Sequence, residues 1–246
     1  MKPYVKLAES TMPDGTIYSL HKHDGKIYLK YNGFELMSTA LTYSEQMLAD
    51  YGCQALKEGK GSRPSHPKVL IGGLGLGFTL KRTLELVGSP ATVDVAELMP
   101  PLIDWNRTHL VEHNGPLLED PRTHIMQGDL YNIISDANPA SYDSLLLDID
   151  NTPDDLITSG NSRLYSPGFL DKLRNVLTEK GCLSYWLGIK RVGSFGDFIY
   201  VIYSIIVVVG VFFITNTIKV SVFVLVGIKG ELIRSIGGAI TIGIGI

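Results

Sequence analysis

The chain has 246 residues, enough for one large domain or two small ones with a substantial core. Its 22 basic and 25 acidic residues give a net charge of −3, which argues against a nucleic-acid-binding protein, since such proteins carry a clustered excess of Lys and Arg. Two cysteines exclude a disulfide framework, and the six scattered histidines suggest no metal site.

The charged residues are unevenly distributed along the chain. Residues 1–190 hold 41 of the 47 charged side chains, and residues 191–246 hold the other 6. Residues 198–218 form a run of 21 uncharged residues, about the length that spans a bilayer. Composition alone therefore leaves open whether this run is buried sheet or a membrane helix.

Short, partly alternating apolar runs near the N-terminus predict a small antiparallel sheet within residues 3–40. The runs cover residues 16–20, 26–31 and 34–37. Asp24-Gly25 and Asn32-Gly33 lie between them, and such dipeptides favour type I′ hairpin turns.

A helix is predicted next, because Thr42 and Glu45 have the spacing of a capping box. It should end before the Gly-, Ser- and Pro-rich residues 59–67, which have the composition of a linker. We therefore expect two domains, an N-terminal sheet with its helix over 1–60 and a second domain over 61–246.

From residue 68 onward, apolar runs of strand length alternate with helical segments. Continuous apolar runs suit parallel strands that are buried on both faces. The strand candidates are 69–71, 92–96, 124–127, 144–147 and 182–187, and the helix candidates are 77–87, 100–112 and 167–179. This alternation predicts an α/β fold with a doubly wound, mostly parallel sheet.

A glycine-rich turn with the sequence Gly-Gly-Leu-Gly-Leu-Gly follows the first of these strands, at residues 72–77. Glycines let the backbone turn sharply and let a ligand approach without a Cβ in the way. Glu97 ends the next strand, 20 residues after Gly77, where an acidic side chain can accept hydrogen bonds from ribose hydroxyls. Asp129 and Asp148 end the third and fourth strands, so polar groups gather at the edge where open α/β sheets bind ligands.

The spacing of the glycines argues against a dinucleotide. Gly73-x-Gly75-x-Gly77 lacks the G-x-G-x-x-G offset that sets a pyrophosphate at a helix N-terminus, and no basic residue follows before Lys81. No Gly-Lys-Ser/Thr sequence occurs in this loop, which excludes a Walker loop. The loop is therefore suited to an uncharged or zwitterionic nucleoside.

Taken together, these segments resemble the spermidine synthase-like (polyamine aminopropyltransferase-like) proteins of the class I S-adenosylmethionine-dependent methyltransferase superfamily. The resemblance covers roughly residues 14–190. Its motifs are Pro13-Asp14-Gly15, Glu35-Leu36-Met37-Ser38, Tyr43-Ser44-Glu45, the glycine loop, Val95-Ala96-Glu97, Gly128-Asp129, Asp148-Ile149-Asp150-Asn151 and Leu164-Tyr165-Ser166. The resemblance implies a Rossmann-like, mostly parallel seven-stranded sheet with a C-terminal antiparallel hairpin, plus the small N-terminal sheet.

The same resemblance implies roles for residues at the sheet edge. The nucleoside of S-adenosylmethionine or its decarboxylated form would lie against the loop that contains Gly73, Gly75 and Gly77. Glu97 would hold the ribose and Asp129 the adenine. No metal is implied.

The segment after the fourth strand departs from the family pattern. Members of the family have the sequence D-x-x-D-P there, and its second aspartate deprotonates the attacking amine. This chain has Asn151 at that position. An amide cannot take up a proton near neutral pH, so general-base catalysis would fall to Asp148 or Asp150. The family's acidic pair before Tyr43 is also missing, although a cationic diamine needs carboxylates to hold it. We therefore take Asp148, Asp150, Asn151 and Tyr43 as the candidate catalytic residues.

The function implied is transfer of an aminopropyl or methyl group from decarboxylated or ordinary S-adenosylmethionine to an amine-like small molecule. One alternative is a methyltransferase that acts on another small molecule. The other is a non-catalytic nucleoside-binding module in a homodimer, which the altered catalytic segment would allow.

The apolar C-terminal region has two competing interpretations. Residues 201–214 and 220–228 are rich in Val, Ile and Phe, which prefer strands, and 215–217 can form the turn between them. A membrane helix over 198–218 is the alternative, and we favour the hairpin. Because three of the first ten residues are charged and no apolar run follows, we expect no signal peptide and a cytoplasmic location.

Overall fold

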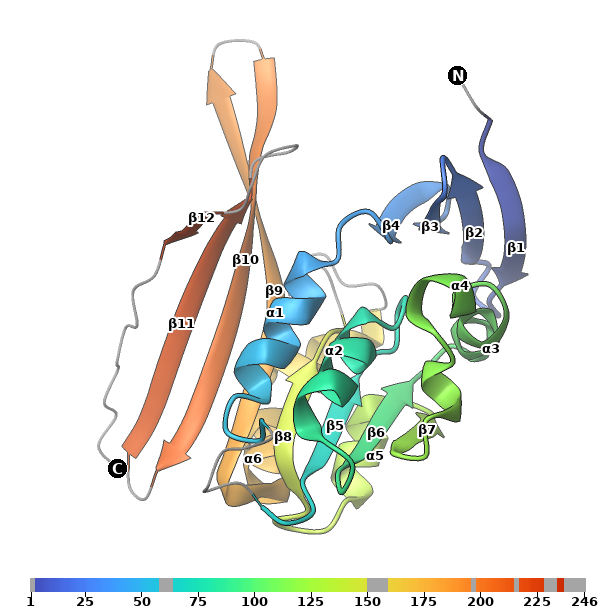
Figure 1. Cartoon of the computed structure of the whole chain (residues 1–246). Coiled ribbons are helices and arrows are strands. Elements are labelled where there is room, and N and C mark those ends of the chain that lie inside the picture. Colours follow the sequence, from blue (N-terminus) through green and yellow to red (C-terminus); the bar gives the residue numbers. More distant parts are fainter. Residues whose placement is uncertain are drawn as a thin grey trace.

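The computed structural model of the chain describes residues 3–57, 64–149, 159–195, 198–214, 217–227 and 234–236. For residues 159–160, and for those after Trp186, it describes the backbone alone. In these ranges the chain forms two β-sheets, and helices flank the larger one (Figure 1).

The N-terminal sheet has four antiparallel strands in sequential order. They are β1 (Val5–Thr11), β2 (Ile17–His23), β3 (Lys26–Tyr31) and β4 (Phe34–Ser38). The turns between β2 and β3 and between β3 and β4 have positive φ at both central residues, 50° and 76° at Asp24 and Gly25, and 47° and 85° at Asn32 and Gly33. Type I′ turns require this conformation, so the predicted hairpins are confirmed.

The larger sheet has the strand order β12-β11-β10-β9-β8-β5-β6-β7. Its five parallel strands are β5 (Lys68–Gly72), β6 (Thr92–Glu97), β7 (Thr123–Gln127), β8 (Tyr142–Leu147) and β9 (Leu177–Phe195). The chain reverses its direction of travel across the sheet after β7, which leaves the carboxyl ends of β5 and β8 side by side at a topological switch point. The predicted doubly wound α/β sheet is confirmed.

Three antiparallel strands complete this sheet on the β9 side. They are β10 (Phe198–Ile214), β11 (Thr217–Gly227) and β12 (Arg234–Ile236). The predicted C-terminal hairpin is therefore confirmed, and residues 215–216 of its turn lie outside the described residues. The predicted number of seven strands was wrong, because β12 adds an eighth that pairs with β11 over three residues and is too short to give a sequence pattern. No helix in the described ranges is long and apolar enough to cross a membrane.

The helices are α1 (Tyr43–Gly52), α2 (Phe78–Val87), α3 (Pro100–Thr108), α4 (Val111–Asn114), α5 (Leu130–Asp136) and α6 (Pro167–Val176), with short 3-10 helices η1 (Leu117–Glu119) and η2 (Ser159–Tyr165). The helix predicted over 100–112 is divided into α3 and α4, because the chain turns at Leu110, which is fully buried against the N-terminal sheet. Helix α5 was not predicted, since its seven residues are too few for a clear period.

The predicted capping box at α1 was wrong. Thr42 is the N-cap, but its side chain accepts no backbone hydrogen bond from the helix; instead its Oγ1 accepts one from Gln46 Nε2 at 2.9 Å. The Glu45 carboxylate accepts a hydrogen bond from the Ser44 hydroxyl. Glu45 is thereby turned away from the cap and toward the end of β8, a position that matters for the site described below.

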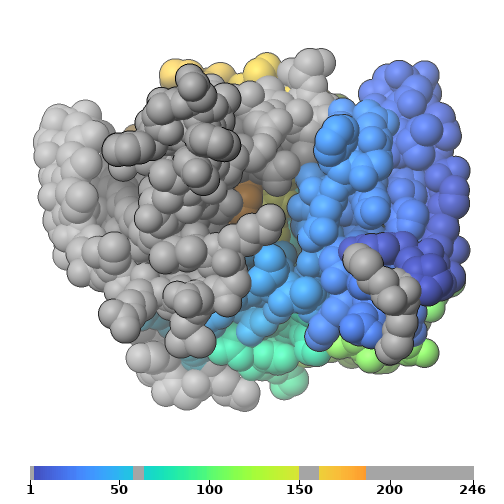
Figure 2. Space-filling model, turned by 90° about the horizontal axis from the view of Figure 1, so that it is seen from above, coloured from blue at the N-terminus to red at the C-terminus, as the bar shows by residue number. Residues whose placement is uncertain are grey.

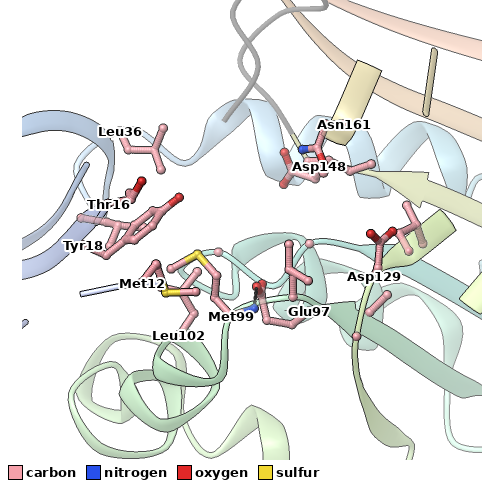
Figure 3. A pocket seen from close by; sticks show the side chains of 18 of the residues that line it. Met12, Thr16, Tyr18, Leu36, Glu97, Met99, Leu102, Asp129, Asp148 and Asn161 are labelled. Carbon is pink, nitrogen blue, oxygen red and sulfur yellow. Dashed lines mark hydrogen bonds between the residues drawn. The ribbon is translucent and has the colours of Figure 1, made fainter. Parts of the chain in front are cut away.

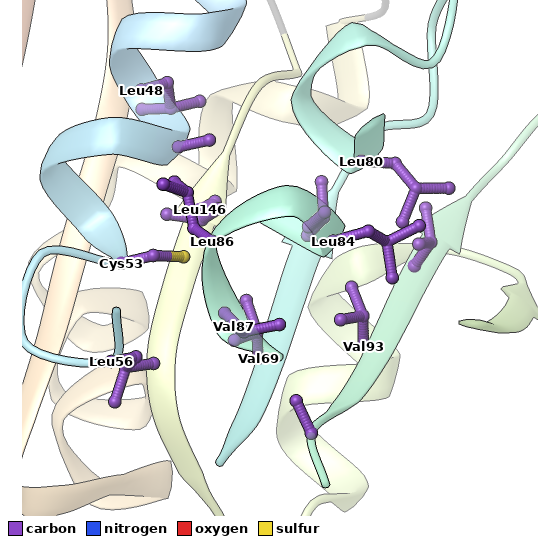
Figure 4. Packing of buried hydrophobic residues seen from close by; sticks show 14 of the residues in the cluster. Leu48, Cys53, Leu56, Val69, Leu80, Leu84, Leu86, Val87, Val93 and Leu146 are labelled. Carbon is purple, nitrogen blue, oxygen red and sulfur yellow. The ribbon is translucent and has the colours of Figure 1, made fainter. Parts of the chain in front are cut away.

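Alternate residues along the parallel strands face two different helix layers, as expected of strands buried on both faces. Val69 and Leu146 pack with α1 and α2, as Figure 4 shows. Leu70 and Leu145 pack with α5 and α6 on the other face. Helix α1 thus shares a core with the large sheet, and the domain boundary at residue 60 stays a prediction.

A third cluster joins the N-terminal sheet to α3. Leu20 and Leu29 of the N-terminal sheet are fully buried against Leu102 and Trp105 of α3. Figure 2, seen from above, shows the blue N-terminal segment packed along one side of the molecule. The small sheet is therefore fixed beside the carboxyl-end edge of the large one.

Candidate active site

A cavity of about 410 Å³ lies between the N-terminal sheet and the carboxyl ends of β5, β6, β7 and β8 (Figure 3). Gly73, Glu97, Asp129 and Asp148 all contribute to its wall. The structure therefore brings together one residue from each of the four strand ends that the sequence singled out, at the edge where open α/β sheets bind ligands.

The glycine loop needs its glycines because their φ angles are positive and because a Cβ would overlap neighbouring atoms. Gly73 has a φ of +94°, and a Cβ there would lie 2.1 Å from the carbonyl oxygen of Asp148. Gly77 has a φ of +86°, and a Cβ there would lie 2.8 Å from Oδ1 of Asn106. Gly73 and Gly75 line the cavity, whereas Gly77 is the N-cap of α2. A residue with a side chain at Gly73 or Gly77 would therefore collide with the neighbouring chain, and only glycine fits.

Two buried asparagines hold the loop in place. Asn106 Nδ2 donates to the carbonyl oxygens of Gly75 and Leu102, at 2.9 and 2.8 Å. Asn114 Nδ2 donates to the carbonyl oxygen of Leu76. No spacing or motif in the sequence marks either residue as a support of the loop.

Glu97 is 5% exposed and is held by backbone donors. Its Oε2 accepts from the Leu74 amide at 2.9 Å, and its Oε1 accepts from the Met99 amide at 2.7 Å. Burial raises the pKa of this carboxyl, while the backbone hydrogen bonds act in the opposite direction. The backbone donors that act on it are Met99, Leu74, Gly75 and Leu98, so the carboxylate is held in a fixed orientation at the wall of the cavity.

Asp129 is more exposed and has a basic partner. Its Oδ1 caps α5 by accepting from the Tyr131 amide at 2.8 Å. Its other oxygen forms an ion pair with Arg163, whose guanidinium carbon lies 4.4 Å from the centre of the Tyr131 ring. Arg163 was not among the predicted site residues, and nothing in the sequence links it to Asp129, 34 residues earlier.

Asp148 and Glu45 form a pair of neighbouring carboxyl groups. Asp148 Oδ2 accepts from the Thr79 hydroxyl at 2.9 Å, and the Asp148 amide donates to the carbonyl oxygen of Gly72 at 2.8 Å. Burial and the nearby Glu45 carboxylate raise the pKa of Asp148 to about 7. Burial likewise raises the pKa of Glu45. A carboxyl group that titrates near neutral pH is suited to proton transfer.

The other predicted catalytic residues are less informative. Tyr43 begins α1, is 48% exposed and does not line the cavity. Asp150 and Asn151 lie outside the described residues. Their roles stay predictions.

The opposite wall of the cavity is apolar and comes from the N-terminal sheet and α3. Its apolar residues are Met12, Pro13, Leu29, Leu36, Met37, Met99 and Leu102, and Thr16 and Tyr18 add hydroxyl groups. Leu29 is fully buried and Leu102 is 6% exposed, whereas Leu36 and Met37 are half-buried. The sequence predicted the small sheet but did not predict that it forms one wall of the cavity.

The charged residues that line the cavity, among those the structure describes, are all acidic: Asp14, Glu97, Asp129 and Asp148. Asp14 lies at the exposed rim, where its Oδ1 accepts from the Thr16 amide at 2.9 Å. No Lys, Arg or His belongs to the described part of the wall. The cavity therefore favours a cationic ligand over an anionic one.

The sequence is similar to those of polyamine aminopropyltransferases. It is 30% identical over 122 residues to the enzyme so named from Saccharolobus solfataricus, which covers 49% of this chain and 38% of that protein. The chain thus matches well under half the length of the curated relatives. No protein-family profile matches the sequence.

The fold is similar to that of solved spermidine synthases. The structure from Thermotoga maritima superposes with a TM-score of 0.59 at 18% identity, over 74% of this chain and 56% of that one. A spermidine synthase in complex with the transition-state analogue AdoDATO gives a TM-score of 0.58 over the same shares. The resemblance to spermidine synthase-like proteins that the motifs predicted is confirmed, in sequence over about half of the chain and in fold over about three quarters.

Proposed function

We propose that this chain transfers an aminopropyl group from decarboxylated S-adenosylmethionine to an amine. Its curated relatives are named for this transfer, and a solved structure of similar fold binds a transition-state analogue. The observation that carries the proposal is the acidic wall of the cavity, whose described residues include four carboxyl groups, of which Asp129 is paired with Arg163, and no basic side chain.

The charge of the wall favours the decarboxylated donor. This donor has a sulfonium and an ammonium, and both are attracted by carboxylates. Ordinary S-adenosylmethionine carries in addition a carboxylate, for which the described wall offers no cationic partner. Methyl transfer from S-adenosylmethionine is the second candidate and is the alternative outcome of the experiment below.

The nucleoside would lie along the strand ends. Glu97, which lines the cavity and is oriented by backbone amides, would accept hydrogen bonds from the ribose hydroxyls. Asp129 would bind the adenine at the far end of the cavity, where the Arg163 ion pair fixes the orientation of its carboxylate. Gly73 would let the nucleoside approach the backbone closely, because it has no side chain to block the way.

Asp148 would act as the general base. The lone pair of the acceptor nitrogen forms a bond to the methylene carbon next to the sulfonium, and the carbon–sulfur bond breaks with its electrons on sulfur. Methylthioadenosine is the leaving group, and the amine proton passes to Asp148. The sulfonium already activates the carbon, so the protein contributes chiefly placement and the removal of this proton.

Calorimetry on the purified chain tests the proposal. Decarboxylated S-adenosylmethionine should bind at least about tenfold more tightly than S-adenosylmethionine, because burial of an unpaired carboxylate is unfavourable. Tighter binding of S-adenosylmethionine would favour the methyltransferase. Binding of neither nucleoside would refute both functions.

A further inference from the structure

We infer that Glu45 and Asp148 share one proton, and that Glu45 thereby acts as a positioning residue for the general base. This role rests on the proposed function, in which Asp148 takes the proton of the attacking amine. Asp148 lines the cavity, whereas Glu45 is not among the residues of its wall, so Glu45 would act through Asp148 and would not touch the substrate. The inference depends on how α1 is placed against β8.

The C-terminal end of α1 is fixed against the middle of β8. Ser144 Oγ donates to the carbonyl oxygen of Gly52 at 2.8 Å, and a Cβ on Gly52 would overlap the side chain of Leu146. One turn back along the helix, Leu48 packs in the same cluster as Leu146, as Figure 4 shows. Helix α1 therefore runs antiparallel to β8, with its N-terminal end toward the carboxyl end of the strand.

The lengths of the helix and the strand bring Glu45 level with Asp148. From Gly52 back to Glu45 is seven residues, or about 10 Å of helix, and from Ser144 to Asp148 is four residues, or about 13 Å of strand. Positions 45, 48, 49 and 52 follow the i, i+3, i+4, i+7 spacing of one helix face, and the last three are buried. Glu45 therefore belongs to the face of α1 that packs on the sheet.

Asp148 faces the same helix layer from the strand side. Its amide donates to the carbonyl oxygen of Gly72, so the strand pairing continues to this residue, and alternate residues along a strand share a face. Leu146 packs in the cluster formed with α1 and α2, and Asp148, two residues on, accepts a hydrogen bond from Thr79 of α2. The two carboxyl groups therefore meet between α1, α2 and the end of β8.

A hydroxyl group donates a hydrogen bond to each of the two carboxyl groups. Ser44 Oγ donates to Glu45, and Thr79 Oγ1 donates to Oδ2 of Asp148 at 2.9 Å. Burial raises the pKa of both carboxyl groups, and burial together with the Glu45 carboxylate raises the pKa of Asp148 to about 7. Because two neighbouring carboxyl groups do not both ionise easily, the pair should keep one proton up to near-neutral pH.

Other charged groups belong to the same part of the molecule. Glu97 of β6 and Asp129 of β7 line the same cavity, and Arg163 of η2 is paired with Asp129. Asp150 lies outside the described residues. Among the described groups, Glu45 is the charged one that acts on the pKa of Asp148, so the test changes Glu45.

The shared proton would make Asp148 a stronger base. When both carboxyl groups are ionised, the pair takes up the proton that leaves the amine nitrogen as the carbon–nitrogen bond forms, and the repulsion between the two negative charges is relieved. The proton then passes to solvent as the products leave, which restores the ionised pair. General-base catalysis is most effective when the pKa of the base lies near the working pH.

The pH dependence of the transfer tests the inference. Glu45→Gln removes the charge and keeps the shape, so the midpoint of the pH profile of kcat/KM for the amine should fall by at least about 0.5 pH unit. Thr79→Val removes the hydroxyl that favours ionised Asp148 and should move the midpoint upward. Glu45→Asp keeps a carboxylate and should move it less than Glu45→Gln. Glu85→Gln makes the same chemical change on the exposed surface of α2 and should leave the midpoint unchanged.

A second measurement does not depend on turnover. Carboxyl ¹³C NMR of the full chain follows the titration of Asp148 directly, and Asp148→Asn identifies its signal. Glu45→Gln should lower this midpoint as well. Methylthioadenosine binding by each variant reports that it has folded.

The same Asp148 midpoint in Glu45→Gln and in the unmodified chain would overturn the inference. Equal shifts in Glu45→Gln and Glu45→Asp would also overturn it, since the shape of the side chain and not its charge would then be responsible. A chain that forms no product at any pH contradicts the proposed function instead, and the NMR titration still decides whether the two carboxyl groups share a proton.

Discussion

The two walls of the cavity are built in opposite ways. On the sheet edge, glycines, buried asparagines and Glu97 are fixed by backbone hydrogen bonds, and a Cβ on Gly73 would overlap a carbonyl oxygen. On the N-terminal side, half-buried Leu36 and Met37 contribute apolar surface and no directional bond to the cavity. The first wall suits a ligand of fixed shape, and the second suits ligands that vary.

This difference predicts unequal effects of mutation on the two sides. Changes on the sheet edge should alter nucleoside binding, because they move a rigid backbone. Changes on the apolar wall should alter acceptor binding alone. Asp148 lies between the two walls, and its substitution should lower kcat more than it weakens the binding of either ligand.

Asp148→Asn should have the largest effect, a fall in kcat of at least about 100-fold with nucleoside affinity nearly unchanged, because the general base is lost and its shape is kept. The unmodified chain should gain activity as pH rises through about 7, where Asp148 loses its proton. Asp104→Asn, on the exposed surface of α3, is the control and should retain activity. Equal kcat values for Asp148→Asn and the unmodified chain would refute the assignment.

The same variant should be more stable than the unmodified chain at pH 8. The native Asp148 carboxyl holds its proton up to a pKa of about 7, against an ordinary value of 3.8, so its contribution to stability falls as pH rises between these values and is constant above them. Removal of the buried charge should raise the midpoint of thermal unfolding at pH 8 by at least about 2 °C. At pH 4 the difference should largely disappear.

Gly73→Ala should have the next largest effect. The clash with the Asp148 carbonyl and the positive φ should together lower the free energy of unfolding by about 2–4 kcal/mol. Nucleoside affinity should fall at least about tenfold as the loop moves. Gly33→Ala is matched in φ, +85°, but has no atom within 4 Å of the new Cβ, so it should lose only about 1 kcal/mol and bind nucleoside normally. Indistinguishable results for the two variants would mean that the close approach at Gly73 is unimportant.

Asn106→Ala should have an intermediate effect. It removes the side-chain donor of the Gly75 carbonyl oxygen, whereas the Leu102 carbonyl oxygen keeps its helical backbone donor. The loss should reduce the free energy of unfolding by about 1–3 kcal/mol and weaken nucleoside binding several-fold. Thr108→Ala removes a side-chain hydrogen bond on the exposed face of the same helix and should change stability by less than about 0.5 kcal/mol. Denaturant titration and calorimetry distinguish the two.

Leu36→Ala should have the smallest effect. It reduces apolar contact with the acceptor and should raise the KM for the amine by a few-fold, with no change in nucleoside affinity. Leu170→Ala, at an exposed position on α6, should change neither quantity. A loss of nucleoside affinity in Leu36→Ala would contradict the division between the two walls.

Most of the fold could be predicted from the sequence, because its signals are local. Asp24-Gly25 and Asn32-Gly33 require positive φ and so specify hairpins. Continuous apolar runs around Val69 and Leu145 predicted strands that are buried on both faces. The capping box at Thr42 failed because neighbouring side chains competed: the Glu45 carboxylate accepts from the Ser44 hydroxyl, and Thr42 Oγ1 accepts from Gln46 Nε2.

The site could be predicted only where a residue sits at a strand end. Glu97 and Asp148 fulfil that condition, since the carboxyl ends of parallel strands share one edge. Asn106 and Arg163 lie in helices, and each contacts the site through a partner more than 30 residues away, which no local pattern records. The apolar wall was missed for the same reason, because it is formed by the packing of the small sheet on α3.

The most direct test of the account is to incubate the chain with decarboxylated S-adenosylmethionine and an amine and to measure products by mass spectrometry. The account predicts methylthioadenosine and the aminopropylated amine in equal amounts, formed faster as pH rises through about 7 and not formed by Asp148→Asn. Nucleoside binding without any product, or methylated amine from S-adenosylmethionine, would contradict it.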